Sequence, residues 1–374
     1  MTPNSEAELA DAIASAKTPL RIMGGGTRPV GNPVAGEVLS TSGLSGIELY
    51  EPGALTIVAK AGTPVAEIEA ALSKENQRLA FEPMDHRSLL GTNGTPTIGG
   101  IVAANVSGPR RVQSGACRDH MLGVRFVDGT GTILKNGGRV MKNVTGYDLV
   151  KLLTGSYGTL GVLTEVSLKV LPKTDTQATL MIHGLDFPQA VKAMSAALGS
   201  PYEVSAAAHM PDMGHGAVTM LRIEGFEQSV AYRAEQLANE LATFGEITVE
   251  TDAGKSAKIW TASRDVAGFE NADGDVWRIS VKPTDGATIA ASLGANQLFM
   301  DWGGGLIWAV MPKGTDLRAR MNGTPGHATL IRADEATRAT LGTFHPELAP
   351  VAKISAGLRN KFDPKGILNP GLMA

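Results

Sequence analysis

Three glycine-rich segments constrain what this chain can fold into more than any other feature. They are Gly24–Thr27, the stretch from Gly91 to Gly108, and Gly155–Gly161. Glycine supplies 45 of the 374 residues, well above the usual share of about 7%. Glycine at this density implies tight turns and close approaches of the backbone. Because each segment lies at the end of a predicted strand or helix, together they indicate one extended ligand.

The first segment follows a predicted strand, Leu20–Met23, as the phosphate-binding loop of a Rossmann fold would. A Rossmann fingerprint continues into a helix, whereas Pro29, Gly31 and Pro33 prevent a helix here. Successive backbone N–H groups of a glycine loop can still bind an anion without a helix. Taken alone, the segment is equally compatible with a purely structural turn.

Composition excludes several classes of protein. A net charge of −3 leaves no basic excess for nucleic acid. The single cysteine, Cys117, excludes an intrachain disulfide and a four-thiolate iron–sulfur cluster. The acidic N-terminus is not a signal peptide, and no apolar run approaches the roughly 18 residues of a membrane span. We therefore expect a cytoplasmic protein that reaches a membrane only through partners.

The length predicts more than one domain, and the pattern of elements changes near Pro172. The first part contains a helix opened by Ser5 and Glu8, a small-residue helix at 98–105, and a hairpin around Asp128-Gly129. The second part predicts strand 178–183, helix 186–198, strands 203–209 and 217–225, helix 227–244 and strand 246–250. That order is typical of a ferredoxin-like α+β sheet. No internal repeat is evident, and a last helix spans 349–361.

The amino-acid sequences of these segments resemble those of a known family. Residues 20–28, 95–108 and 143–172 resemble the three signature segments of the PCMH-type, vanillyl-alcohol-oxidase-like FAD-binding domain. Lys142–Leu149 followed by Gly155–Glu165, and the closing Phe362–Gly371, are similar to FAD-linked 2-hydroxy-acid oxidases and dehydrogenases. More narrowly, Ser107–Arg111, Arg118-Asp119 and Gly138–Asn143 resemble the FAD-binding subunits of bacterial glycolate oxidases.

The resemblance implies an α+β fold with a PCMH-type two-subdomain FAD-binding domain at 1–172. A ferredoxin-like α+β second domain would follow at 173–345, and a C-terminal helix and tail at 346–374 would pack back toward the FAD domain. It implies non-covalent FAD, because the possible covalent attachment residues His86, Cys117 and Tyr147 lie in no linkage motif. The implied cofactor-binding residues are Gly24, Gly25, Gly26, Thr27, Arg28, Thr97, Ile98, Gly99, Gly100, Ala104, Asn105, Ser107, Gly108, Gly161 and Val162.

The chain also departs from the catalytic members of this family. It lacks their His-x-His-x-Gly-Asp-Gly-Asn and Glu-His-Gly segments, and Tyr157 stands where they usually have Glu. No metal site is expected, and the pair His209 and His215 fits a solvated loop better than a metal. The catalytic residues stay unknown.

Three functions are compatible with these features. The first is the FAD-binding subunit of a glycolate oxidase complex, with a homologous FAD-linked catalytic subunit and an iron–sulfur subunit as partners. The second is a self-sufficient FAD-dependent oxidoreductase that recruits Arg278, Lys282 and Tyr147. The third is a flavin-free scaffold, against which the intact glycine segments argue. Trp260, Trp277, Trp302 and Trp308 are expected in the core or, in a complex, on the surface that docks the partners.

Overall fold

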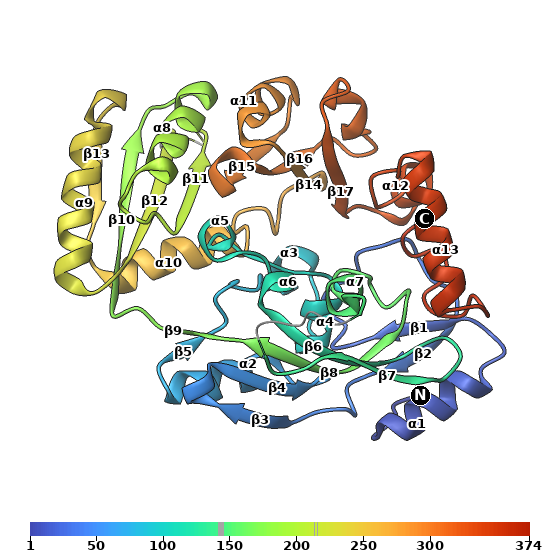
Figure 1. The fold of residues 1–374 in the computed structure, drawn as a ribbon. Helices are drawn as coiled ribbons and strands as arrows, with labels where there is room; N and C mark the ends of the chain where they lie inside the picture. The colour runs from blue at the N-terminus through green and yellow to red at the C-terminus, as the bar shows by residue number, and fades with distance from the viewer. Residues whose placement is uncertain (141–145, 213, 215) are drawn as a thin grey trace.

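A computed structural model describes residues 1–374 except 141–145, 213 and 215 (Figure 1). The N-terminal half contains two sheets that matter for the site: a parallel pair, β1 and β2, and an antiparallel five-stranded sheet in the order β3-β4-β8-β6-β7. The strands are β1 Leu20–Met23, β2 Glu37–Ser40, β3 Ile47–Glu51, β4 Thr56–Lys60, β5 Gln77–Arg78, β6 Met121–Val127, β7 Ile133–Gly137, β8 Val162–Lys169 and β9 Leu171–Pro172. The helices are α1 Glu6–Ser15, α2 Val65–Lys74, α3 Arg87–Leu90, α4 Ile98–Ala103, α5 Arg111–Ser114, α6 Cys117–His120 and α7 Leu149–Leu153.

Short-range chemistry accounts for several of these elements. The Ser5 hydroxyl accepts a hydrogen bond from the Glu8 backbone and begins α1, whereas the Glu8 carboxylate accepts from Asn4 rather than completing a reciprocal box. The Asp128 carboxylate accepts from the backbones of Thr130 and Thr132 and closes the β6–β7 hairpin. These elements lie where the sequence predicts them.

The second half builds an antiparallel eight-stranded sheet in the order β13-β10-β12-β11-β15-β16-β14-β17. Its strands are β10 Thr176–His183, β11 Ala206–Met210, β12 Val218–Gly225, β13 Ile247–Glu250, β14 Asp275–Val281, β15 Gln297–Asp301, β16 Leu306–Met311 and β17 Gly326–Arg332. Its helices are α8 Phe187–Gly199, α9 Glu227–Leu241, α10 Ala253–Arg264, α11 Pro283–Ser292 and α12 Glu335–Leu341.

This sheet holds a topological repeat that the sequence does not reveal. Strands β10 to β13 lie in the ferredoxin-like order 4-1-3-2, as expected, and β14 to β17 lie in the same order. The two units join at β11 and β15, where His209 pairs with Met300. One mixed α+β architecture with a ferredoxin-like second part is thus confirmed, but the ferredoxin-like unit occurs twice.

The two faces of the large sheet have different neighbours. Helices α8, α9 and α11 cover one face, and the other face packs on the N-terminal half, which lies below it in Figure 1. The apolar core is continuous across this contact, where Leu79 and Phe81 share one cluster with Trp260 and Trp302. The division of the chain into domains at residues 172 and 345 stays a prediction.

All four tryptophans are buried within the chain: Trp260, Trp277, Trp302 and Trp308. The sequence-based expectation that they form a docking surface for partner subunits is wrong, because Trp260, Trp302 and Trp308 pack in the core shared by the two halves and Trp277 packs in the core of the second half. Their alternative assignment as core residues is correct.

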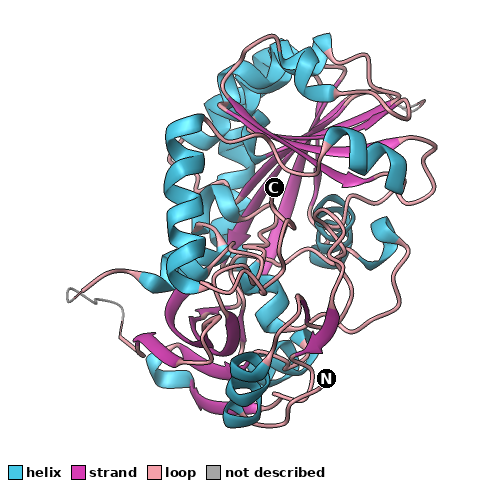
Figure 2. Cartoon of the chain, turned by 90° about the vertical axis from the view of Figure 1, so that its right-hand side faces the viewer, coloured by secondary structure: helices cyan, strands magenta, loops and turns pink. Residues whose placement is uncertain are grey.

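The C-terminal segment returns to the N-terminal half. After α13, Ala349–Phe362, the chain runs beside β1, where Leu368 forms a parallel bridge with Leu20. Both views place the C-terminus at mid-height, between the two halves of the molecule (Figures 1 and 2). The tail therefore lies next to the first glycine segment.

Candidate cofactor site

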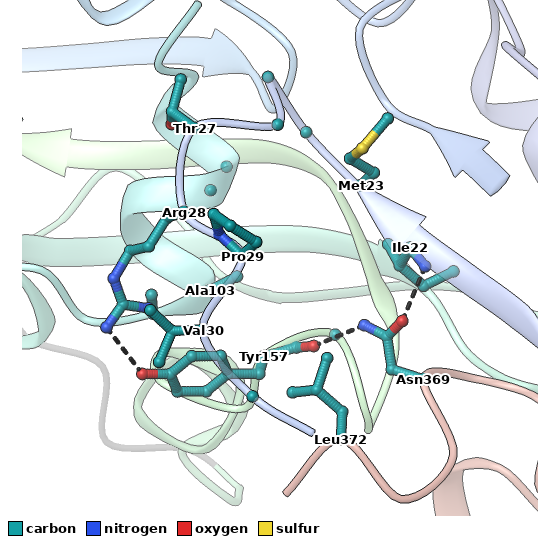
Figure 3. Close-up of a pocket in the computed structure, with 18 of the residues that line it drawn as sticks. Ile22, Met23, Thr27, Arg28, Pro29, Val30, Ala103, Tyr157, Asn369 and Leu372 are labelled. Carbon is teal, nitrogen blue, oxygen red and sulfur yellow. Dashed lines mark hydrogen bonds between the residues drawn. The ribbon is translucent and has the colours of Figure 1, made fainter. Parts of the chain in front are cut away.

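A cavity of about 510 Å³ lies where the three glycine-rich segments meet. Its volume is in the range of cofactor and small-molecule sites. The walls come from the β1 strand and the loop after it, from the start of α4, from the turn before β8, and from the C-terminal tail. Figure 3 shows 18 of the lining residues.

The first glycine segment presents unpaired backbone donors to this cavity. Within the described part of the chain, the N–H groups of residues 24–28 donate no hydrogen bond. A Cβ atom on Gly25 would lie 1.5 Å from the Thr95 carbonyl oxygen, and one on Gly94 would lie 1.8 Å from that of Gly25. Only glycine allows the two loops to approach so closely. A run of free N–H groups in a tight loop fits a phosphate-bearing group.

The second segment opens a short helix toward the cavity. The Thr97 hydroxyl caps α4 by accepting a hydrogen bond from the Gly100 N–H at 3.3 Å. Gly99 packs on Ala61, where an added Cβ would lie 2.7 Å from the Ala61 carbonyl oxygen. Gly100 is different, since a Cβ there would approach only the Thr97 Oγ1, at 3.2 Å. The space in front of Gly100 belongs to the cavity.

Tyr157, in the third segment, connects the walls of the cavity. Its N–H donates to the Ala103 carbonyl and its own carbonyl accepts from the Asn369 side chain. Its hydroxyl accepts from Arg28 Nη2 at 3.1 Å (Figure 3). Its φ of +53° is unusual for an aromatic residue. Tyr157 thus connects the first, second and third glycine segments with the C-terminal tail.

The Asn369 side chain completes this connection from the tail. It accepts a hydrogen bond from the Ile22 N–H and donates one to the Tyr157 carbonyl, both at 2.8 Å. The end of β1 and the third glycine segment are thereby fixed relative to each other, as the dashed lines of Figure 3 trace.

His86 lies beside Arg28 as a neutral imidazole. Burial, and the nearby Arg28, hold its pKa well below the ordinary value. Its Nε2 accepts from Arg28 Nε at 3.2 Å, and its Nδ1 lies 3.3 Å from the Met84 carbonyl, which fits Nδ1 as the protonated nitrogen. The Nε2 lone pair is therefore occupied, and His86 positions Arg28.

The structure brings eleven of the fifteen predicted cofactor residues to the cavity wall. Those eleven are Gly24, Gly25, Gly26, Thr27, Arg28, Thr97, Gly99, Gly100, Ala104, Gly161 and Val162.

The other four lie away from the wall, each with a structural partner. Ile98 is fully buried in the core, and the Asn105 side chain accepts from the Arg118 N–H. The Ser107 hydroxyl accepts from the Cys117 N–H, and the Gly108 carbonyl accepts from Trp302 Nε1.

Sequence reasoning assigned no binding role to several lining residues, namely Tyr157, Asn369, Leu372 and Arg338, and it considered His86 only for covalent attachment. Arg338 comes from α12 and donates to the Pro29 carbonyl at 3.0 Å. The C-terminal motif was the one sequence feature that indicated a role for the tail in the site, but it did not identify which tail residues line the cavity.

Of the possible covalent attachment residues, only His86 lines the cavity. Cys117 is buried elsewhere, and burial raises the pKa of its thiol. Tyr147 is 89% exposed and outside the lining.

Of the histidine pair considered for a metal, the structure describes only His209. His209 is buried on β11, where its Nδ1 lies 3.0 Å from the Thr219 hydroxyl, and burial lowers its pKa to about 4. His215 lies outside the described residues. Within the described chain, no group of three or more His, Cys, Asp or Glu side chains is placed to hold a metal. Among the described helices, none has the length and apolar character needed to cross a bilayer.

Comparisons with known proteins agree with this fold and site. Residues 1–137 match the family FAD_binding_4, described as an FAD binding domain. Two solved structures share the fold at a TM-score of 0.71: an alkyldihydroxyacetonephosphate synthase, with 17% identity over 99% of this chain and 76% of that one, and the 4-ethylphenol oxidase of Gulosibacter chungangensis, with 12% identity over 100% and 88%. The protein is an FAD-linked oxidoreductase of the PCMH-type fold.

The particular relationship comes from the sequence. The chain is 35% identical to the glycolate oxidase subunit GlcE of Escherichia coli over 98% of this chain and 95% of that protein. It belongs to the GlcE family of FAD-linked oxidases. A D-lactate dehydrogenase of Archaeoglobus fulgidus is 32% identical over 47% of this chain and 38% of its own length. These relatives identify an FAD-linked hydroxy-acid oxidoreductase.

Proposed function

We propose that this chain is the FAD-binding subunit of a glycolate oxidase complex. In this complex a homologous FAD-linked subunit oxidises glycolate or another 2-hydroxy acid to the 2-oxo acid, and an iron–sulfur subunit receives the electrons. The observation that carries the proposal is the end-to-end match to a subunit of a named glycolate oxidase, together with a cavity built by the three glycine segments. A second relative, from Bacillus subtilis, is named glycolate oxidase subunit GlcD and is 44% identical over 85 residues.

The cavity supports FAD held without a covalent bond. The donors of residues 24–28 suit the pyrophosphate, and the open face of Gly100 leaves room for the chain of the cofactor. When bound, the flavin supplies the electron-accepting chemistry. The protein residues bind and orient it: Asn369 and Tyr157 fix the loops, and His86 holds Arg28 in place.

The first test measures the cofactor. Acid precipitation of the purified chain should release free FAD into the supernatant, detected by chromatography. Flavin that remains with the precipitated protein would contradict non-covalent binding, and FMN or no flavin would contradict the cofactor assignment.

The second test measures activity. The FAD-loaded chain alone should oxidise glycolate or lactate with an artificial acceptor at a small fraction of the rate of the assembled complex, because the family's histidine segments are missing from its sequence. Co-expression with the FAD-linked and iron–sulfur subunits should yield one co-purifying, active complex. Rapid turnover by the single chain would instead favour a self-sufficient oxidoreductase. We place the complex in the cytoplasm, peripheral to the inner membrane.

A further inference from the structure

Three arginine side chains gather near one end of the cofactor cavity: Arg28 lines it, and Arg111 and Arg278, which are outside its lining, both pack against Trp302 of the second half. Arg28 follows β1, Arg111 begins α5, and Arg278 lies on β14. The guanidinium carbons of Arg111 and Arg278 lie 4.3 and 5.0 Å from the centre of the Trp302 ring. Arg28 and Arg278 both act electrostatically on His86, which lines the cavity. Trp302 and its neighbours thus mark the second-domain side of the site.

The guanidinium groups of these arginines have no carboxylate partner. Within the described part of the chain, the side chains of Arg111 and Arg278 form no hydrogen bond and no ion pair. The Arg28 guanidinium donates to a neutral imidazole and to a phenol, those of His86 and Tyr157. The donors of Arg111 and Arg278, and the remaining donors of Arg28, are therefore available to an anion.

Three acids lie in the neighbourhood, and in the described part of the chain none of them forms an ion pair with Arg28, Arg111 or Arg278. Asp301 on β15 is buried, and burial raises its pKa to about 7. Glu82 is already paired with two other arginines, Arg110 and Arg222. Asp119 attracts Arg111 without an ion pair, and its carboxylate accepts from the Ala116 N–H.

Arg28, Arg111 and Arg278 are each partly buried. A cluster of partly buried cations without a counter-ion is unfavourable, and an anion that joins it lowers that cost. Burial lowers the pKa of the Arg278 guanidinium to about 10, in the direction this cost implies, and leaves the group protonated at neutral pH. Guanidinium groups present paired donors whose spacing matches the two oxygens of a carboxylate. The surrounding rings favour an organic acid over a fully hydrated inorganic anion, since Phe344 packs edge-on against Tyr157 with ring centres 5.0 Å apart.

We propose that Arg278, Arg111 and Arg28 form a binding site for the carboxylate of a small organic acid, at the boundary between the cofactor cavity and the second domain. That this acid is a 2-hydroxy or 2-oxo acid rests on the proposed function. The sequence analysis named Arg278 and Arg28 separately, and only the tertiary structure brings them together, because they are 250 positions apart. The proposed site is one for binding and orientation.

The test is isothermal titration calorimetry with sodium oxalate, performed on both the flavin-free and the FAD-loaded chain. Oxalate should bind the wild-type chain, and Arg278→Gln and Arg111→Gln should each weaken binding at least tenfold. Arg278→Lys should bind with intermediate affinity, because lysine keeps the positive charge but lacks the paired N–H donors of a guanidinium group. The control is Arg359→Gln on α13, outside the cavity wall, which should bind oxalate as the wild type does. Sodium phosphate at the same concentration should not displace oxalate.

Three results would overturn the proposal. They are wild-type oxalate affinity in Arg278→Gln and Arg111→Gln, equal displacement by phosphate, and loss of flavin from Arg278→Gln in proportion to its loss of oxalate binding. The last result would assign the arginines to the cofactor. Failure of the proposed function would give a different result: the wild-type chain would hold no flavin or would not co-purify with partner subunits. Oxalate binding to the flavin-free chain could still be measured in that case.

Discussion

At the scale of single residues, Gly100 offers the sharpest test of the cofactor site. It lies in α4, has no positive φ, and faces open space apart from the Thr97 hydroxyl. Gly100→Asp should therefore fold, but its carboxylate would occupy the space expected for a pyrophosphate or ribityl oxygen of the cofactor, with steric overlap and like-charge repulsion. We expect flavin content, measured by absorbance of the purified protein, to fall below about a tenth of wild type, a loss of at least about 1.4 kcal/mol.

The matched control is Gly199→Asp. Gly199 is also a helical glycine, and an added Cβ there would meet no atom within 4 Å. It is the last residue of α8, which covers the face of the eight-stranded sheet that is turned away from the N-terminal half. It should keep wild-type flavin content. Equal flavin in the two variants would show that the cavity is not the cofactor site.

Asp301 gives a prediction about pH. Burial raises its pKa from 3.8 to about 7, so the folded state holds this proton more tightly than the unfolded state. Its contribution to stability is therefore full below about pH 4, declines as the pH rises toward 7, and is constant above that. Relative to Asp301→Asn, the wild type should lose on the order of 2–4 kcal/mol of unfolding free energy between pH 4 and 7.5. Parallel pH curves from urea unfolding would contradict the buried, protonated carboxyl.

At the scale of elements, the C-terminal tail acts as a wall of the site. Asn369 is buried at a φ of +45°, a conformation that asparagine tolerates. Asn369→Ala would leave the Ile22 N–H and the Tyr157 carbonyl without partners. Since each buried unpaired group costs about 1–3 kcal/mol, urea unfolding should show a loss of about 2–5 kcal/mol, and FAD should bind more weakly.

Asn369→Gly separates the two roles of this residue, because glycine accepts the backbone conformation but removes the same hydrogen bonds. Weakened FAD binding in both variants would assign the effect to the side chain. Full FAD affinity in Asn369→Ala would mean that the tail does not shape the cavity.

At the scale of the whole molecule, a buried ion network joins the two halves. Glu224 on β12 pairs with Arg78 and Arg110 at 2.7 Å, and Glu82 pairs with Arg110 and Arg222 at 2.9 Å. The arginines hold the pKa of Glu224 well below its ordinary value against the opposing effect of burial. The network therefore stabilises the joined halves at neutral pH, and its contribution is lost as the pH falls.

Glu224→Gln should cost about 3–5 kcal/mol, because it leaves three arginines with one carboxylate. We expect calorimetry to resolve two thermal transitions in place of one as the halves uncouple. The control is Glu203→Gln, whose ion pair with Arg233 involves a side chain that is 74% exposed and should cost less than about 1 kcal/mol. A single transition at the wild-type temperature in Glu224→Gln would contradict a role in joining the halves.

The features that depend on near neighbours follow from the amino-acid sequence alone. The glycine segments, the Ser5 cap and the Asp128-Gly129 hairpin are set by local backbone preference and local hydrogen bonds, and each lies where it was predicted. The amino-acid sequences of the signature segments indicated the family, and the family in turn indicated the fold class and the cofactor. The first ferredoxin-like unit followed from the order of its elements, since that order limits the possible sheet topologies.

Contacts between residues far apart in the chain set the rest. Ile98 and Ser107 belong to a glycine-rich segment, yet the packing turns them into the core and onto Cys117, while Asn369 enters the site from more than 200 positions beyond Tyr157. Long-range contacts also determine the second ferredoxin-like unit, the burial of the tryptophans and the grouping of arginines without carboxylate partners. Side-chain direction, burial and charge balance are properties of the packed interior, and they exist only once the two halves meet.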